Sequence, residues 1–388
     1  MTREMQKNGK NWNYSALCFQ SVLIIMVVSS HANILLDGPA DLFPVVSYFV
    51  QGFAFISGYL YSMRHDETPG KYCVGRVRRL LIPTFLIYLC YGVLVSILRY
   101  INLIDMGQPI SLQNLTLRLF DNGQQFELNA PMWFLGPFFL AQCVHCCLRA
   151  LIRLITVRTW LSSVLVADLF SLIAGVCCAC IAVNSANRGL LFADTFGLLL
   201  GRVSVLLAWI AFGRFYGAHC EKYIVMIPGG GWPVLLLLIL LQPLVFYFAG
   251  GSLGSHIVWM SFSQGALFSF ISGVTGILFL WTICQMVAPK LDQMGRKLVF
   301  VLGSNTMSIM CHHLLGFFVL KCIFYFLHIV TGGLGLFDVA AFRVQPYYRY
   351  FPQGIYQFAI WYIVFGIAFS LLIHQIWLAM KRRVISAS

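Results

Sequence analysis

Long apolar runs separated by short polar segments dominate the pattern of the chain. About ten of these runs approach or exceed the ~20 residues that a helix needs to cross the hydrocarbon core of a bilayer. They are continuous rather than alternating, which predicts helices and disfavours a closed barrel of strands. The predicted spans are residues 15–36, 43–63, 80–101, 131–153, 161–183, 194–216, 232–250, 260–287, 299–329 and 356–379.

Two of these runs carry further information. The first, which starts at Ala16, contains a histidine and lacks a small-residue cleavage site followed by a soluble chain. It is therefore expected to be the first span rather than a signal peptide. The ninth run, 299–329, is longer than a span needs, so we expect it to be tilted, broken or interfacial at one end.

Composition narrows the class of protein. Hydrophobic residues make up 60% of the chain and charged residues only 10%, against about 25% charged residues in a soluble domain. This balance excludes a soluble enzyme, a disordered protein and a conventional nucleic-acid binder. Most of the 13 cysteines lie inside apolar runs, where they act as small hydrophobic residues and not as a disulfide framework.

The distribution of charge predicts the topology. The formal net charge is +13. With a cytoplasmic N-terminus, the predicted inner segments hold about three times as many Lys and Arg residues as the outer ones, as the positive-inside rule requires. We therefore expect an all-α integral membrane protein with about ten transmembrane helices and both termini cytoplasmic. It would form a single polytopic domain over residues 1–388, with the lipid bilayer as its partner and no nucleic acid.

His31, in the first span, is the first candidate for chemistry. An ionisable group inside a span is costly and is by default a functional hypothesis. At ~1.5 Å per residue, His31 lies roughly 24 Å from the inner end, in the outer half of the membrane. A histidine near the outer interface that bonds to a neighbouring helix is an equally good interpretation. A pKa of ~6.5 suits a general base toward a hydroxyl group.

The second candidate is an arginine cluster at the predicted cytoplasmic entrance of span three. Arg76, Arg78 and Arg79 lead into Leu80-Leu81-Ile82-Pro83. As a bare charge cluster, ordinary anchoring and snorkelling is the favoured interpretation. Because arginine forks match phosphate geometry, a docking site for a nucleotide-bearing cofactor is the alternative.

Two further segments are candidates. Trp133 opens span four on the predicted outer side, and an aromatic-belt anchor is its favoured interpretation. Segment 303–313, in span nine, is unusually polar for a buried helix and ends in two histidines. Adjacent residues cannot share one helix face, so at most one of His312 and His313 is expected to face His31. Ordinary hydrogen bonding between helices is the alternative.

Weaker signals predict no further site. The cysteines and histidine of segment 143–147 diverge around a helix axis, so they cannot all ligate one ion, and no metal is expected. Asp168, in span five, is a single acid and thin evidence for a proton relay. Asn114-Leu115-Thr116 fits a glycosylation sequon, which matters only in a eukaryotic secretory context.

Taken in order, five of these segments resemble the acyltransferase-3 family, the membrane acyltransferases that decorate surface glycans. The last segment most resembles the fucose O-acetylase-like branch, with Thr306 where serine is common. One position departs from the family pattern: Gln20 stands where the family usually has Arg or Lys, eleven residues before the histidine. The five segments are Val27–His31, Phe53–Leu60 with its Ser57-Gly58 pair, Arg76–Pro83, Trp133–Leu135 and Gly303–His313.

The resemblance implies transfer of an acyl group, most often acetyl, from cytoplasmic acyl-CoA to a sugar hydroxyl. The implied donor is acetyl-CoA, with no metal, and the implied acceptor is a surface polysaccharide or a lipid-linked glycan at a bacterial cytoplasmic (inner) membrane. His31 would deprotonate the acceptor hydroxyl or otherwise promote transfer. The arginine cluster would meet the CoA phosphates. The implied supporting residues are Ser57, Gly58, Trp133, Asn305 and His313.

Two other functions stay open at this point. A secondary transporter or flippase for a glycan or small anion could line its path with His31, Asp168 and His313. Against it, no repeat is evident between the two halves of the chain. A non-catalytic scaffold accommodates Gln20 but leaves the ordered segments unexplained. Membrane enzymes of the glycerolipid class place Asp five residues after His, whereas this chain has Leu36.

Overall fold

The computed structural model describes residues 12–34, 42–156, 164–190 and 196–387. Among these residues, 8 helices are long and apolar enough to cross a membrane, and two shorter apolar helices cover Val45–Tyr59 and Trp232–Phe248. The all-α membrane fold is therefore confirmed, while the exact number of spans and the orientation of the termini stay predictions. The eight long helices cover Tyr14–His31, Pro69–Tyr100, Ala130–Thr156, Val164–Asn187, Phe196–Ile224, Ala266–Lys290, Thr306–Thr331 and Tyr356–Arg383.

Helices make up most of the described part of the first half of the chain, with loops at 101–111 and 121–129. Two segments of these long helices are wound as π-helix, at Val77–Leu81 and Tyr216–Cys220. The α-helices are α2 (Tyr14–His31), α3 (Phe49–Tyr59), α4 (Arg64–Glu67), α5 (Pro69–Arg76), α6 (Ile82–Tyr100), α7 (Leu112–Leu115), α8 (Leu117–Phe120), α9 (Leu135–Thr156), α10 (Val164–Asn187) and α11 (Phe196–Phe215).

The second half adds a short hairpin to the helices. Strands β1 (Ser255–His256) and β2 (Ser261–Phe262) pair antiparallel, and Met260 between them is left-handed. The helices are α12 (Glu221–Val225), α13 (Trp232–Phe248), α14 (Ala266–Val287), α15 (Gln293–Ser304), α16 (Thr306–Thr331), α17 (Val339–Val344) and α18 (Ala359–Ala387).

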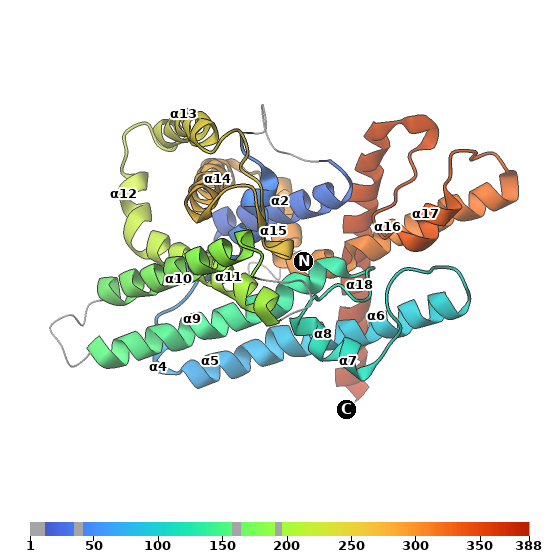
Figure 1. Ribbon diagram of the computed structural model, residues 1–388, viewed down its shortest axis with the longest axis horizontal. Coiled ribbons are helices and arrows are strands. Elements are labelled where there is room, and N and C mark those ends of the chain that lie inside the picture. Colours follow the sequence, from blue (N-terminus) through green and yellow to red (C-terminus); the bar gives the residue numbers. More distant parts are fainter. Residues whose placement is uncertain (1–11, 35–41, 157–163, 191–195, 388) are drawn as a thin grey trace.

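The helices pack around two central members. Helix α11 contacts α3, α9 and α10, and helix α2 contacts α3, α14, α15 and α16. In Figure 1, α5, α9 and α10 run side by side through one part of the molecule, and α18 crosses α16 elsewhere. The buried core therefore joins segments that are far apart in the sequence.

Two predicted spans differ from the sequence pattern at their ends. The first span was expected to reach residue 36, but α2 ends at His31 because Asn33 takes a left-handed conformation at φ 65°. Residues 35–36 lie outside the described part of the chain. The ninth span is broken, as one of the predicted options had it, since α15 ends at Ser304 and α16 begins at Thr306.

The contact between α3 and α11 depends on glycine. A Cβ atom at Gly58 would lie 1.8 Å from the carbonyl oxygen of Ile210, and one at Gly213 would lie 1.9 Å from that of Phe55. Neither distance is physically possible, so only glycine lets these two backbones approach so closely. Gly58 therefore has a packing role in the structure.

A buried ion network joins α4, α9, α10 and α11. Arg149 binds Asp66, with Nη2 and Oδ2 3.0 Å apart, and also binds Asp168. Arg214 and His219 reach the same Asp168 carboxylate, at 3.2 Å and 2.7 Å. Both carboxylates are fully buried, and every cation in this network has a carboxylate partner. Asp168, considered above as a proton relay, thus holds helices together.

We expect Asp168→Asn to lower the free energy of unfolding by about 3–5 kcal/mol, because breaking a buried ion pair leaves uncompensated charge behind. Thermal or denaturant unfolding of the detergent-solubilised protein measures this. Asp105→Asn is the matched control, since Asp105 pairs with Arg343 in the open and should cost less than about 1 kcal/mol. Equal effects of the two substitutions would contradict a structural role for the network.

Candidate active site

The structure brings together two of the predicted histidines. His31 lies at the end of α2, and His313 lies two turns into α16. Their rings stack at 5.0 Å between centroids, and His31 Nδ1 is 2.8 Å from His313 Nε2. His313 Nδ1 is 2.8 Å from the carbonyl oxygen of Ile309. The two histidines therefore form a hydrogen-bonded chain that ends on the backbone.

This chain of contacts fixes which nitrogen carries each proton. A carbonyl oxygen only accepts, so His313 must donate from Nδ1. In the neutral ring, His313 Nε2 is then an acceptor, and His31 must donate to it from Nδ1. The remaining nitrogen of His31, Nε2, keeps its lone pair. His31 is thus oriented as a base by His313, in the way that a carboxylate orients the histidine of a hydrolase triad.

The neighbouring histidine faces elsewhere. His312 Nδ1 lies 2.9 Å from the hydroxyl of Tyr91 on α6, and that hydroxyl also reaches the carbonyl oxygen of Cys311 at 3.0 Å. Only one histidine of the pair therefore faces His31, as the helical geometry predicts.

The break between α15 and α16 determines where the polar segment of span nine points. Asn305 lies at the break, and its Nδ2 donates to the carbonyl oxygen of Val301 at 2.7 Å. Its amide is therefore used within the chain, and Asn305 lines neither of the two cavities described below. The next residue, Thr306, does line one of them.

A cavity of about 260 Å³ opens beside His31. We refer to it as the His31 cavity. Trp133 and Tyr347 bring aromatic rings to its wall, and the Tyr347 ring lies 5.5 Å from that of His31. The hairpin β1–β2 closes one side. The lining residues are Val27, His31, Val46, Phe49, Val50, Phe53, Gln124, Pro131, Trp133, Phe134, His256, Ile257, Val258, Trp259, Met310 and Tyr347.

A second cavity, of about 270 Å³, holds several of the other predicted residues. We refer to it as the Arg76 cavity. Ser57 lies in it and accepts a hydrogen bond from Gln142 Nε2 at 3.2 Å. Gln20 also lines this cavity, as Arg76 does. The lining residues are Gln20, Phe53, Ile56, Ser57, Leu60, Arg76, Leu80, Phe134, Leu135, Phe138, Gln142, Thr306, Met307 and Met310.

The arginine cluster divides at this cavity. Arg76 lies in its wall, with the guanidinium carbon 4.8 Å from the centre of the Tyr72 ring. Arg78 and Arg79 are exposed and sit in the π-helical segment Val77–Leu81. Pro83 has no N–H group to donate to the carbonyl of Arg79, which accounts for the wider winding at this point.

The two cavities adjoin each other. Phe53, Phe134 and Met310 line both of them, and the rings of Phe53 and Phe134 lie 6.2 Å apart. His31 is on one side of this apolar partition and Arg76 is on the other. Trp133 and Phe134 are consecutive residues, so one short segment contributes to both walls.

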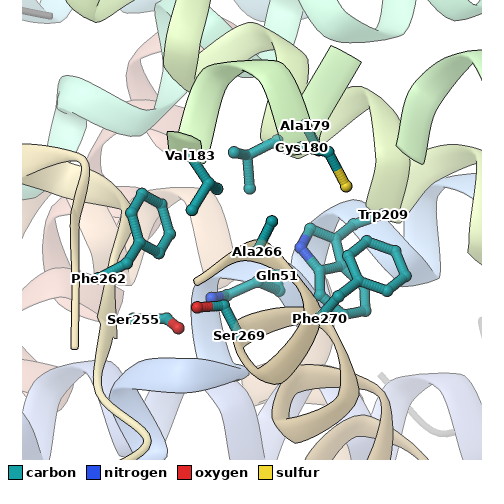
Figure 2. Close-up of a pocket in the computed structure, with 11 residues that line it drawn as sticks. Gln51, Ala179, Cys180, Val183, Trp209, Ser255, Phe262, Ala266, Ser269 and Phe270 are labelled. Carbon is teal, nitrogen blue, oxygen red and sulfur yellow. The ribbon is translucent and has the colours of Figure 1, made fainter. Parts of the chain in front are cut away.

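A smaller cavity does not have the properties of a substrate site. It measures about 20 Å³, little more than one water molecule needs. Figure 2 shows its lining side chains, among them Gln51, Trp209 and Phe270, which close in from α3, α11 and α14. None of the predicted site residues lines it.

Three cations near the His31 cavity were not predicted as site residues. Arg202 is fully buried, with its guanidinium carbon 4.7 Å from the centre of the Trp133 ring. Lys321 is fully buried on α16, and Arg349 follows Tyr347 by two residues. A charged residue inside an apolar run is a signal for the first two, since it implies a protein-lined environment. Arg349 lies in a loop and gives no such signal.

The structure offers no metal centre in its described part. Within residues 12–34, 42–156, 164–190 and 196–387, no three His, Cys, Asp or Glu side chains are arranged to hold an ion. In segment 143–147, Cys146 and His145 are buried while Cys147 is exposed, so these side chains point in different directions.

Comparison with known proteins gives one match. Residues 18–376 match the model of the acyltransferase-3 family, which is described as an acyltransferase domain. The match covers nearly the whole chain. No curated protein and no solved structure matches.

We expect both His31 and His313 to carry their proton on Nδ1 in the neutral protein. Nitrogen chemical shifts of protein labelled with ¹⁵N-histidine report the tautomer of each ring, and the variants His31→Ala and His313→Ala assign the two signals. In His313→Ala, His31 loses the acceptor for its Nδ1–H, and we expect its ring to become a mixture of tautomers. A proton on His31 Nε2 in the unaltered protein would contradict the deduced chain.

Proposed function

The chain belongs to the acyltransferase-3 family, and from that premise we propose that it transfers an acyl group, most often acetyl, from acyl-CoA to a hydroxyl of a surface polysaccharide or lipid-linked glycan. The observation that carries this proposal is the pair of adjoining cavities, with Arg76 in one and the His31–His313 chain in the other. The family makes the protein a membrane acyltransferase, and the two cavities supply separate places for a donor and an acceptor.

The Arg76 cavity is the proposed donor site. Arg76, with the exposed Arg78 and Arg79 close by in sequence, offers guanidinium groups for the phosphates of CoA. Gln20 lines the same cavity, so Arg76 is the cation that this cavity keeps. With both termini cytoplasmic, as the charge distribution predicts, this cavity would open toward the cytoplasm. The thioester end would then point at the apolar partition.

The His31 cavity is the proposed acceptor site. Its aromatic side chains Trp133 and Trp259 give flat apolar faces that suit a sugar ring. An acceptor hydroxyl at His31 Nε2 would give up its proton as its oxygen attacks the thioester carbon. The carbon–sulfur bond then breaks, and the CoA thiolate takes the proton back from His31. His313 would stabilise the imidazolium between these steps by accepting from Nδ1.

The apolar partition lies between the proposed donor site and the proposed acceptor site. Phe53, Phe134 and Met310 lie where the two substrates would meet, and their side chains exclude water from the thioester. Exclusion of water favours transfer over hydrolysis. Ser57 and Gln142, hydrogen-bonded to each other on the donor side, are polar groups that could hold the thioester oxygen.

The alternative of a transporter or flippase gains no specific support. Asp168, one of the three residues proposed for its path, is enclosed in the ion network and lines neither cavity. The family match also concerns acyltransferases. Transport without acyl-CoA consumption would favour this alternative.

We expect His31→Ala to lower acyl transfer by at least about 100-fold, since a general base contributes that much. The measurement uses a strain that lacks this chain, complemented with wild type or variant, and mass spectrometry of envelope glycans before and after mild alkali. His328→Ala is the control, since His328 lies on α16 and lines neither cavity. Alkali-labile acyl groups restored equally by His31→Ala, with membrane insertion verified, would remove His31 from the chemistry.

We expect Arg76→Gln to raise the KM for acyl-CoA by about 10-fold with little change in kcat, because one charge-assisted hydrogen bond to a phosphate is lost. Steady-state kinetics of the purified protein in nanodiscs measures both constants. Lys71→Gln removes the same charge from an exposed position on α5 and should leave KM unchanged. An unchanged KM in both variants would place the CoA phosphates elsewhere.

A further inference from the structure

Several of the buried and half-buried cations among the described residues fall into two groups. Arg149 and Arg214, in the ion network, have the carboxylates of Asp66 and Asp168 as partners. Three cations around the His31 cavity do not: no carboxylate of the described residues lies within ion-pair distance of Arg202, Lys321 or Arg349. An unpaired charge that is removed from water costs several kcal/mol. The second group therefore needs an explanation that the first does not.

Arg202 holds the frame of the cavity through backbone carbonyls alone. It donates from Nη1 to Asp121 at 3.0 Å and to Asn122 at 3.1 Å, and from Nε and Nη2 to Val258. All these acceptors are carbonyl oxygens. They satisfy its N–H groups but do not cancel its charge, and Asp121, the acid that acts on Arg202, is already paired with Arg118. The Arg202 guanidinium lies against the Trp133 ring that lines the cavity.

Lys321 does the same for the loop beside His31. Its Nζ donates to the carbonyl oxygens of Gln345 at 3.3 Å and Pro346 at 3.2 Å. These two carbonyls directly precede Tyr347, whose ring lies 5.5 Å from that of His31. Lys321 thereby fixes the loop that completes the cavity wall.

Arg349 is the least satisfied of the three. Its Nε is buried, and no described residue accepts a hydrogen bond from it. Its charge acts on both His31 and Tyr347. Burial lowers the pKa of Arg349 to about 10, which still leaves the guanidinium charged at neutral pH. It thus brings an unused donor and a full positive charge close to the proposed base.

The described residues that line the cavity contribute no negative charge. They include His31 and His256 but no Asp or Glu. Glu127 is the acid whose charge reaches Tyr347, and its own carboxylate accepts from the backbone of Gly107 and feels the charge of Arg99. Asp121, whose charge acts on Arg202, is paired with Arg118. Among the described residues, the cations around the cavity therefore outnumber the carboxylates.

We propose that the acceptor carries a negative charge next to the hydroxyl that is acylated, and that Arg349 binds this group while Arg202 and Lys321 supply the field that attracts it. The inference rests on the proposed function and specifies its acceptor. The anionic group is a carboxylate or a phosphate, since both match the guanidinium fork. Binding at Arg349 would turn the neighbouring hydroxyl toward His31 Nε2.

An anion at this position would offset the free energy that it costs to keep the three cations away from water without a carboxylate partner. A bound carboxylate or phosphate compensates charge that the protein leaves unpaired, in a setting of low dielectric where such attraction is strong. A carboxylate would come from an acidic sugar, and a phosphate would come from the linkage of a sugar to a lipid or to its neighbour. Both sources offer an anionic group to the guanidinium, and the acylated products differ in whether they carry a carboxylate or a phosphate.

The first arm of the test identifies the acceptor. Acyl-bearing glycans and glycolipids are isolated from the complemented strain, and mass spectrometry locates the alkali-labile acyl group. We expect a carboxylate or phosphate on the acylated sugar or on its direct neighbour, and the mass distinguishes the two sources. An acylated product that is neutral at both positions would overturn the inference and leave the proposed function intact. Absence of any acylated product would remove both.

The second arm measures the role of Arg349 with that acceptor and with its neutralised form, obtained by carboxyl reduction or dephosphorylation. We expect Arg349→Gln to raise the KM for the anionic acceptor by about 10-fold to 100-fold, as expected for a lost charge-assisted hydrogen bond. The KM for acyl-CoA should not change. With the neutralised acceptor, wild type and Arg349→Gln should have the same KM.

Two controls separate recognition from structure. Arg343→Gln removes a charge from the same stretch of chain, where Arg343 pairs with Asp105 in the open, and should leave both KM values unchanged. Arg349→Lys keeps the charge and should recover part of the affinity for the anionic acceptor. A fall in kcat by the same factor with charged and neutralised acceptors would instead assign Arg349 to the reacting oxygen and overturn the inference.

Discussion

A charge inside an apolar bundle must be compensated, and this constraint shapes the whole molecule. In the ion network the compensation is built in, since Asp66 and Asp168 neutralise the cations of α9 and α11 and hold four helices together. Around the His31 cavity, backbone carbonyls accept from Arg202 and Lys321, and those that bind Arg202 do not cancel its charge. The charges of the ion network thus compensate one another, whereas the surroundings of the His31 cavity can accommodate an anion.

The same constraint explains the histidine pair. Neutral rings that donate in one direction, from His31 to His313 to the carbonyl of Ile309, place two ionisable residues in the bundle without a net charge. A carboxylate in the position of His313 would bind the protonated base more strongly but would add a buried negative charge beside an acceptor that we propose to be anionic. A neutral orienting group avoids that repulsion.

Most of the helices and several residues of the candidate site could be predicted from the sequence. The features that could not be predicted have physical reasons. Apolar runs predict the helices because a bilayer demands continuous hydrophobic length, and helical geometry alone separates His312 from His313. The pattern could not foresee that Gly58 is a packing residue, because its role depends on a backbone 152 residues away, at Ile210. Nor could it place Arg202, Lys321 and Arg349 around the His31 cavity, because their positions there follow from tertiary packing. The amide of Asn305 is used at a helix break that apolar composition does not reveal.

The π-helical turn at Val77–Leu81 sets the phase between two halves of one long helix. A π turn holds one residue more than an α turn, and each residue rotates the chain by about 100°. The wider turn therefore sets the rotation of α5 relative to the apolar face of α6. That rotation determines which side chain of α5 faces the cavity. Deletion of Val77 alone would keep all three arginines of the cluster and the apolar residues of α6, yet it would rotate Arg76 away from the cavity wall. The rotation of α5 relative to α6 is therefore itself a determinant of the site.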